Sequence, residues 1–238
     1  VLWVPAGRSA TTAGRAAAAG LEAADSVAGL AAAADVIVSV CPPHAALPTA
    51  RAVAAAGRFP GIYLDANAIA PGTAREVRAV TAVAGASYVD GGIIGSPPDP
   101  AAPGRSRLYL SGERADEVRA LFAGTALDAR VIDGPPEAAS AVKMAYAGWT
   151  KGSAALLLAV RALARAEGVE EALLAEWALS QPGLPGQHAA ASWSAAAKGW
   201  RWTGEMEEIA ASMAADGLPG GFHQAAAEIF GRSARPGN

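Results

Sequence analysis

Cysteine is almost absent from this sequence, because its 238 residues include only Cys41. A single cysteine excludes a disulfide framework and a cysteine-based zinc site. The three histidines, His44, His188 and His223, are too scattered along the sequence to indicate another kind of metal centre. We therefore predict no metal, and we expect His223 to be a surface residue.

Long apolar runs and clusters of basic residues are also missing. No apolar run reaches the length that crosses a bilayer, and no secretory signal pattern is visible. The 19 basic residues against 22 acidic ones leave a net charge of -3, without the basic patch that binds nucleic acid. These absences predict a cytoplasmic protein with no membrane and no nucleic-acid partner.

Hydrophobic residues, by contrast, make up 52% of the sequence, which is ample for one large domain or two modest ones. Over residues 1–134, strand-like segments alternate with helix-prone ones, a pattern that implies a parallel α/β sheet. The continuous β-branched run at residues 35–41 is typical of a strand covered on both faces. We expect Ser26 to cap a short helix that follows it.

The pattern becomes helical after Gly134 and stays so to the end. We therefore predict an α/β domain over residues 1–134 and an all-helical domain over residues 135–238. Two prolines, Pro135 and Pro136, favour the start of a long helix that continues to Gly168. Further helices are expected at about residues 170–180, 188–215 and 221–232, where proline and glycine separate the helical patterns.

A lysine lies one turn into the apolar face of the long helix. Lys143 has no acidic residue three or four positions away, and Lys151 flanks the same face two turns later. Partial burial of Lys143 would favour a neutral amine that can accept and donate a proton. The alternative is a lysine whose aliphatic stem lies along the helix and whose amine reaches water.

Five segments, in this order, resemble the β-hydroxyacid dehydrogenase family, which includes 6-phosphogluconate dehydrogenase and 3-hydroxyisobutyrate dehydrogenase. They are ADVIVSVCPP (34–43), YLDANAIAP (63–71), YVDGGIIG (88–95), LYLSG (108–112) and VKMAYAG (142–148). The segment RWTGEMEEI (201–209) is similar to a branch whose members are labelled NAD-binding phosphogluconate dehydrogenases. The resemblance implies a Rossmann-type parallel sheet, a helical domain that forms a homodimer, a nicotinamide cofactor and a small-molecule substrate.

The resemblance also implies roles for particular residues. Lys143 matches the family's catalytic lysine, a general acid/base that exchanges a proton with the substrate oxygen while hydride passes to or from nicotinamide. The family's Ser-Gly-Gly loop for the substrate carboxylate aligns with Ile94, Gly95 and Ser96, of which only Gly95 matches. We take Lys151 as a further candidate for substrate contact.

The cofactor candidates lie at strand ends. By resemblance the turn formed by Cys41, Pro42 and Pro43 borders the cofactor, and Cys41 itself is expected to be a small core residue rather than a nucleophile. Asn67, after another strand, either meets the nicotinamide or substrate or serves only the turn.

Arg8 and Ser9 follow what would be the second Rossmann strand, where NAD-specific enzymes place an acidic residue. Arg8 suits the 2′-phosphate of NADP instead, so NADP is predicted, with NAD still possible. The glycine loop G-x-G-x-x-G and the first strand that carries it are missing before Val1. We therefore expect that this sequence lacks its true N-terminus and binds pyrophosphate poorly.

Two departures from the family limit the substrate. Ala147 stands where the family usually has asparagine, and Thr150 stands where 6-phosphogluconate dehydrogenase has glutamate. Oxidative decarboxylation of a sugar phosphate is therefore not expected. We predict an NADP-dependent oxidoreductase acting on a small β-hydroxyacid or related alcohol. Two alternatives stay open: an imine or enamine reductase, whose relatives generally replace the lysine, and a catalytically silent nicotinamide-binding dimer.

Overall fold

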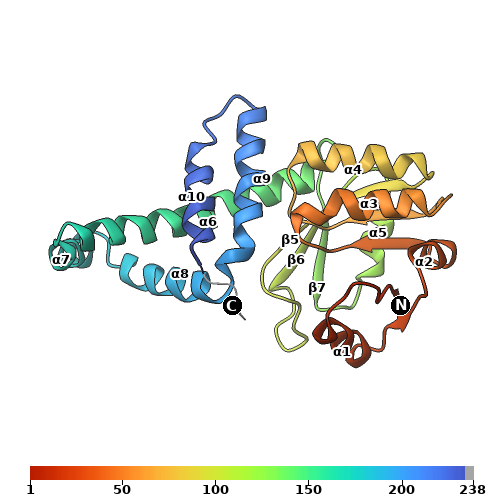
Figure 1. Cartoon of the computed structure of the whole chain (residues 1–238), viewed down its shortest axis with the longest axis horizontal. Coiled ribbons are helices and arrows are strands. Elements are labelled where there is room, and N and C mark those ends of the chain that lie inside the picture. Colours follow the sequence, from red (N-terminus) through yellow and green to blue (C-terminus); the bar gives the residue numbers. More distant parts are fainter. Residues whose placement is uncertain (234–238) are drawn as a thin grey trace. The chain divides into compact units, whose positions relative to one another are not determined.

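The computed structural model describes residues 1–233 of the chain (Figure 1). These residues form two compact units, which are described separately. The α/β unit comprises Val1–Asn67 and Pro71–Ala141, and the helical unit comprises Ala68–Ala70 and the residues from Val142 onward. Within residues 1–233, no helix combines the length and apolar character needed to cross a membrane.

The α/β unit contains two sheets. Strands β1 (Leu2–Trp3) and β2 (Glu22–Ala23) form a parallel pair, and five further strands form the main sheet in the order β3-β4-β5-β6-β7. The five are β3 (Val36–Ser39), β4 (Ile62–Asp65), β5 (Ser87–Ile94), β6 (Ser106–Ser111) and β7 (Leu127–Val131).

The predicted parallel sheet is confirmed for every strand pair except one, because β5 and β6 are antiparallel. A parallel connection needs a crossover of a dozen or more residues, usually a helix. Residues 95–105, which join β5 to β6, contain no helix, so β6 returns along β5 in the opposite direction.

Five α-helices and a short 3-10 turn connect these strands. They are α1 (Ala10–Ala18), α2 (Val27–Ala33), η1 (Pro43–Ala45), α3 (Ala46–Ala55), α4 (Pro71–Val83) and α5 (Ala115–Leu121). Ser26 caps α2, as predicted, by accepting a hydrogen bond of 3.0 Å from the Gly29 amide. Figure 1 shows α3 and α4 lying side by side along the sheet.

Strand β3 lies at one end of the described five-stranded sheet. Side chains alternate between the faces of a strand, and here Ile37 and Ser39 are buried while Val38 is 50% exposed. The expectation that this run is covered on both faces is therefore wrong. The hydrophobic core lies further into the sheet, around Leu64, Val89 and Leu108.

The helical unit is built on α6 (Ala138–Ala166), whose first residues belong to the α/β unit. It continues with α7 (Glu170–Ser180), α8 (Leu184–Lys198), the 3-10 turn η2 (Gly199–Arg201), α9 (Trp202–Ala215) and α10 (Gly221–Gly231). The single helix expected at residues 188–215 is therefore wrong. The break falls at Gly199, where a Cβ atom would lie only 2.7 Å from the Ser233 hydroxyl, so this close approach of two chain segments requires glycine.

Helices α9 and α10 pack on each other and share with α6 a core that includes Met206 and Phe230. His223 of α10 is 6% exposed, and its Nε2 donates to the Gly148 carbonyl at 3.0 Å. Gly148 and Gly152, one turn apart on α6, leave the space for this ring, since a Cβ at Gly152 would lie 3.0 Å from Nε2. The surface position expected for His223 is therefore wrong.

Candidate functional site

Two lysines of α6 meet one carboxylate of α9. Glu205 Oε2 accepts a hydrogen bond from Lys151 Nζ, and Glu205 Oε1 lies 3.4 Å from Lys143 Nζ. The exposed fraction of the side chain is 7% for Glu205, 19% for Lys151 and 15% for Lys143, so all three are largely buried. The cluster places two amines against one carboxylate.

The electrostatics of the cluster follow from this burial. Burial is the largest influence on Lys151 and lowers its pKa, with Glu205 opposing the shift and the charge of Lys143 adding to it. Burial by itself would raise the pKa of Glu205, but the two ammonium groups outweigh it, so that pKa is lowered. A carboxylate beside amines of this kind can hold and orient a proton-exchanging group.

Glu205 was the main partner that the sequence reasoning missed. Lys143 has no acidic neighbour on its own helix, and its partner comes from α9, far along the chain. A signal was present in the sequence: Glu205 lies four residues before Ile209 and next to Met206, and both of these residues are apolar. An acidic residue on the apolar face of a helix indicates a buried charge partner.

The predicted residues Arg8 and Ser9 lie at the exposed start of α1. Ser9 caps this helix by accepting from the Thr12 amide at 3.2 Å. Arg15 Nη2 donates to the Thr12 hydroxyl at 3.4 Å, which brings a second guanidinium to the same end. Guanidinium and hydroxyl donors at a helix N-terminus form a set that fits a phosphate group.

The structure brings Cys41 and Asn67 together at the ends of β3 and β4. Asn67 Oδ1 accepts from the Cys41 amide at 2.5 Å, and Asn67 Nδ2 donates to the Ser39 hydroxyl at 2.9 Å. These two hydrogen bonds connect the ends of β3 and β4 through the Asn67 side chain, which is only 2% exposed. Pro42, the next residue after Cys41, is exposed, and Pro43 opens η1.

The Cys41 thiol is not activated. Burial is the main influence on this thiol and raises its pKa, which disfavours a nucleophilic thiolate.

Two buried carboxylates near these strand ends had no predicted role. Asp65 on β4 and Asp90 on β5 are register partners, and both are fully buried. Asp90 accepts from the amide and the hydroxyl of Ser140, both at 2.6 Å, and so binds the first turn of α6. Asp65 accepts from the Asn67 amide at 2.9 Å, while its second oxygen has no hydrogen-bond partner. Burial, as the largest influence, raises the pKa of Asp65 to about 7 and that of Asp90 to about 6.

Gly95 and Ser96 begin the exposed loop after β5. Gly95 has φ +119, and a Cβ there would lie 2.1 Å from the Arg105 carbonyl oxygen, so only glycine fits. Asp90 is level with the end of β4, and Gly95 comes five residues later, which is about 16 Å further along an extended strand. The predicted substrate loop is therefore not gathered with Cys41 and Asn67.

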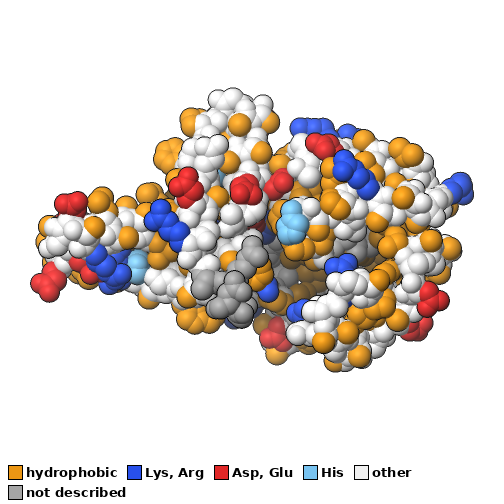
Figure 2. Space-filling view, in the orientation of Figure 1, with side chains coloured by type: hydrophobic (Ala, Val, Ile, Leu, Met, Phe, Trp, Pro, Cys, Tyr) orange, Lys and Arg blue, Asp and Glu red, His pale blue; other side chains and the backbone are white. Residues whose placement is uncertain are grey.

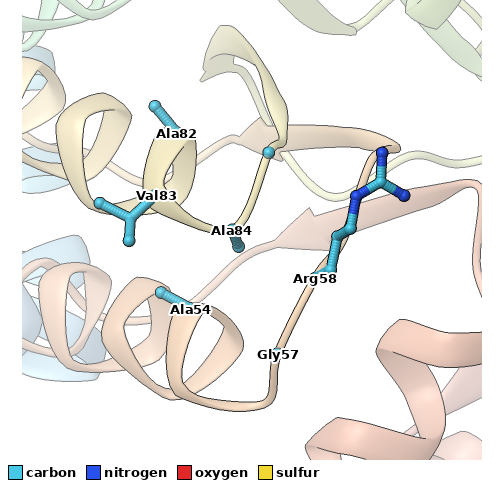
Figure 3. Close-up of a pocket in the computed structure, with 7 residues that line it drawn as sticks. Ala54, Gly57, Arg58, Ala82, Val83 and Ala84 are labelled. Carbon is cyan, nitrogen blue, oxygen red and sulfur yellow. The ribbon is translucent and has the colours of Figure 1, made fainter.

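A shallow hollow on the α/β unit lies between the C-terminal ends of α3 and α4 (Figure 3). Small residues such as Ala54 and Ala84 line it, and Arg58 is its one charged residue. Helix C-termini present carbonyl groups, and no second polar side chain lines the hollow, so we assign no function to it. Among residues 1–233, no three or more His, Cys, Asp and Glu residues are grouped so that they could hold a metal ion.

Comparisons with known proteins agree with this architecture. Residues 164–233 match the family model described as a domain of unknown function, DUF1932. A solved conserved protein of unknown function, MTH1747, reported as structurally similar to 3-hydroxyacid dehydrogenases, is 27% identical with a TM-score of 0.69, covering 97% of this chain and 86% of its own. No curated protein is significantly similar to the chain.

Two further solved structures share the fold at lower identity. The 3-hydroxyisobutyrate dehydrogenase of Mycobacterium tuberculosis, solved with L-serine, is 21% identical with a TM-score of 0.67, covering 92% of this chain and 81% of its own. The reductive aminase of Aspergillus terreus, solved with NADPH and ethyl levulinate, is 22% identical with a TM-score of 0.55. The match covers 97% of this chain and 84% of the reductive aminase. The resemblance stated from the sequence motifs is thus confirmed: the chain has the two-part fold of the 3-hydroxyacid dehydrogenases, and residues 164–233 of its helical unit match the DUF1932 model.

Proposed function

We propose that this protein is an NADP-dependent oxidoreductase that transfers hydride between nicotinamide and a small β-hydroxyacid or related alcohol. The observation that carries the proposal is the gathering of Lys143 and Lys151 at the buried carboxylate of Glu205, on a hydroxyacid-dehydrogenase fold. A bound nicotinamide would supply the hydride acceptor or donor, which no amino-acid side chain provides. The solved reductive aminase that shares the fold contains NADPH, which supports this choice of cofactor.

The chain's own residues supply the proton chemistry and the binding contacts. In the oxidation direction, the neutral amine of Lys143 takes the proton of the substrate hydroxyl as the carbon–hydrogen bond gives up its hydride. In reduction, the Lys143 ammonium returns a proton to the carbonyl oxygen. We assign contact with the substrate's polar groups to Lys151, and we assign the turn of residues 41–43, which Asn67 holds in place, to the border of the cofactor.

The enzyme assay follows directly from this assignment. The purified protein is mixed with NADP⁺ and a panel of small β-hydroxyacids and simple alcohols, and formation of NADPH is followed by its absorbance. Turnover of at least one β-hydroxyacid is expected. Reduction of a ketone only when an amine is present would favour the imine-reductase alternative. Binding of NADPH by calorimetry with no turnover of any substrate would favour the silent binder.

A change at Arg8 tests the cofactor assignment. Arg8→Ala should lower the affinity for NADPH by roughly tenfold or more and change the affinity for NADH little. Only NADPH carries a 2′-phosphate for the guanidinium to bind. Titration calorimetry with both cofactors measures the two affinities. Arg58→Ala, which removes an exposed arginine elsewhere in the α/β unit, should change neither. Equal losses for NADPH and NADH would mean that Arg8 has only a structural role.

We also propose that the protein forms a homodimer through α6. Apolar residues recur at alternating four- and three-residue steps along this helix, with a serine at one step: Val142, Tyr146, Trp149, Ser153, Leu156, Val160 and Leu163. All the apolar members are at least 36% exposed, and Trp149 is 76% exposed. A repeat of this spacing is the seam by which one long helix packs against another.

The seam also indicates the partner. Four of its positions line a groove of about 710 Å³ whose other walls include α7 and α8. Figure 2 shows hydrophobic side chains at the surface of the helical unit. The seam spans 22 residues of α6, whereas the other helices described within residues 1–233 have at most 15 residues. Among these helices, only α6 of a second copy of the chain is long enough to pack along the whole seam.

Charge placed on the seam should therefore separate the subunits. Leu156→Glu together with Leu163→Glu is expected to convert a dimer into a monomer, because two carboxylates would be buried against apolar side chains. Sedimentation velocity at micromolar concentration measures the change. Leu179→Glu is the matched control, since Leu179 is 83% exposed but lies on α7, outside the seam. A wild-type protein that is already monomeric would refute the dimer.

A further inference from the structure

Lysine is rare in this chain, and its few lysines are gathered in one place. The sequence has three lysines against sixteen arginines. Lys143 and Lys151 share Glu205, and the Nζ atoms of Lys151 and Lys198 lie 5.3 and 5.8 Å from the ring centroid of Trp202. Arginine stays protonated in proteins, whereas a lysine amine can lose its proton when it is buried. Two of the three lysine amines thus lie against one carboxylate, that of Glu205.

The two contacts with Glu205 are unequal. Oε2 is in direct hydrogen-bond contact with Lys151, whereas Oε1 is 3.4 Å from Lys143 and has no other hydrogen-bond partner. At that distance Lys143 feels the charge of the carboxylate without a strong hydrogen bond to it. One carboxylate cannot neutralise two ammonium groups, so the cluster carries a surplus positive charge when both lysines are protonated.

We propose that Glu205 is a positioning residue that holds Lys143 and Lys151 at one carboxylate, so that the two amines exchange protons as a coupled pair instead of Lys143 acting alone. The catalytic meaning of this pair rests on the proposed function. In the oxidation direction, Lys143 takes the proton from the substrate hydroxyl while the hydride leaves for nicotinamide. The new Lys143 ammonium then stands beside the Lys151 ammonium at a single carboxylate, and this repulsion promotes release of one proton to water.

Further polar groups lie on the neighbouring helices. Lys198, at the end of α8, adds a further positive charge that disfavours a proton on Lys151. His223 of α10 donates to the Gly148 carbonyl, and Glu208 of α9 accepts from the Ala70 amide at 2.6 Å. Glu205 is the carboxylate that contacts both amines.

The small number of lysines makes the coupling measurable. Selective carbon-13 labelling of lysine yields three Cε signals, which single Lys→Met variants assign, and the Lys151 signal is followed as pH is raised. Lys143→Met should move the titration of Lys151 up by about one pH unit or more, because a neighbouring cation is removed and Glu205 is left to Lys151 alone. Glu205→Gln should move it down by a similar amount, because the stabilising anion is lost. Glu207→Gln, the same change at an exposed position of α9, should leave it unmoved.

Each outcome decides the proposal. A Lys151 titration that Lys143→Met leaves unchanged would overturn the coupled pair, even if Glu205→Gln proved too unstable to study. In an active protein, Glu205→Gln should also shift the pH profile of kcat/KM, and Glu205→Asp should restore part of the original profile, which a purely structural role would not produce. The titration needs neither substrate nor cofactor. A coupled pair in a protein without hydroxyacid turnover would therefore refute the proposed function alone.

Discussion

Replacing Lys143 by alanine is expected to lower turnover of the hydroxyacid by ~10²-fold or more while leaving NADPH affinity intact. The loss follows because alanine offers no group to take the hydroxyl proton. Lys143→Arg should not rescue activity, since a guanidinium does not release its proton near neutral pH. Steady-state kinetics and cofactor titration on the same preparations measure the two effects.

The other lysines are the controls for this result. Lys198→Ala removes a nearby amine that does not contact Glu205. The expected loss of turnover is much smaller than in Lys143→Ala. The pH profile of kcat/KM should show an ionisation that disappears in the Lys143→Ala variant. If Lys151→Ala were the more damaging change, the proton chemistry would belong to Lys151. Full activity in both variants would exclude a lysine acid/base altogether.

Asp65→Asn is expected to stabilise the protein at alkaline pH. Burial raises the folded-state pKa of Asp65 from 3.8 to about 7, so the folded protein holds this proton more tightly than the unfolded chain does. Wild-type stability should consequently fall as pH rises from about 4 to about 7 and then stay low. Asparagine cannot ionise but still accepts the Asn67 amide. The free energy of unfolding of the variant should exceed that of the wild type by on the order of 2–4 kcal/mol at pH 8, and the two should be equal near pH 4.

Denaturant unfolding at a series of pH values measures this difference. Asp25→Asn, the same substitution at an exposed position before α2, should leave the pH dependence of stability as it is in the wild type. Asp90 contributes to the same fall, because burial raises its pKa to about 6, so the Asp65 variant should retain part of the pH dependence. An Asp65→Asn variant less stable than wild type at pH 8 would show that the Asp65 carboxylate is held ionised by an attraction that outweighs its burial.

Several features of the fold could be read from local sequence. Proline and glycine bounded the helix that carries Lys143, and Ser26 marked the start of α2 as a cap. The alternation of strands and helices was enough to indicate the α/β unit, and the order of five short motifs indicated the dehydrogenase fold. These signals are local in the chain: side-chain periodicity, turn chemistry and capping act between residues that are close in sequence.

Tertiary structure alone decided which of these residues meet. The pairing of Lys143 and Lys151 with Glu205 joins α6 to α9, and no periodicity within either helix specifies it. Asn67 was open to a cofactor or a turn role on sequence grounds, and its burial followed from how the ends of β3 and β4 come together. His223 became buried because two glycines on another helix left room for its ring. Burial and charge pairing depend on contacts between distant segments, and such contacts exist only once the chain has folded.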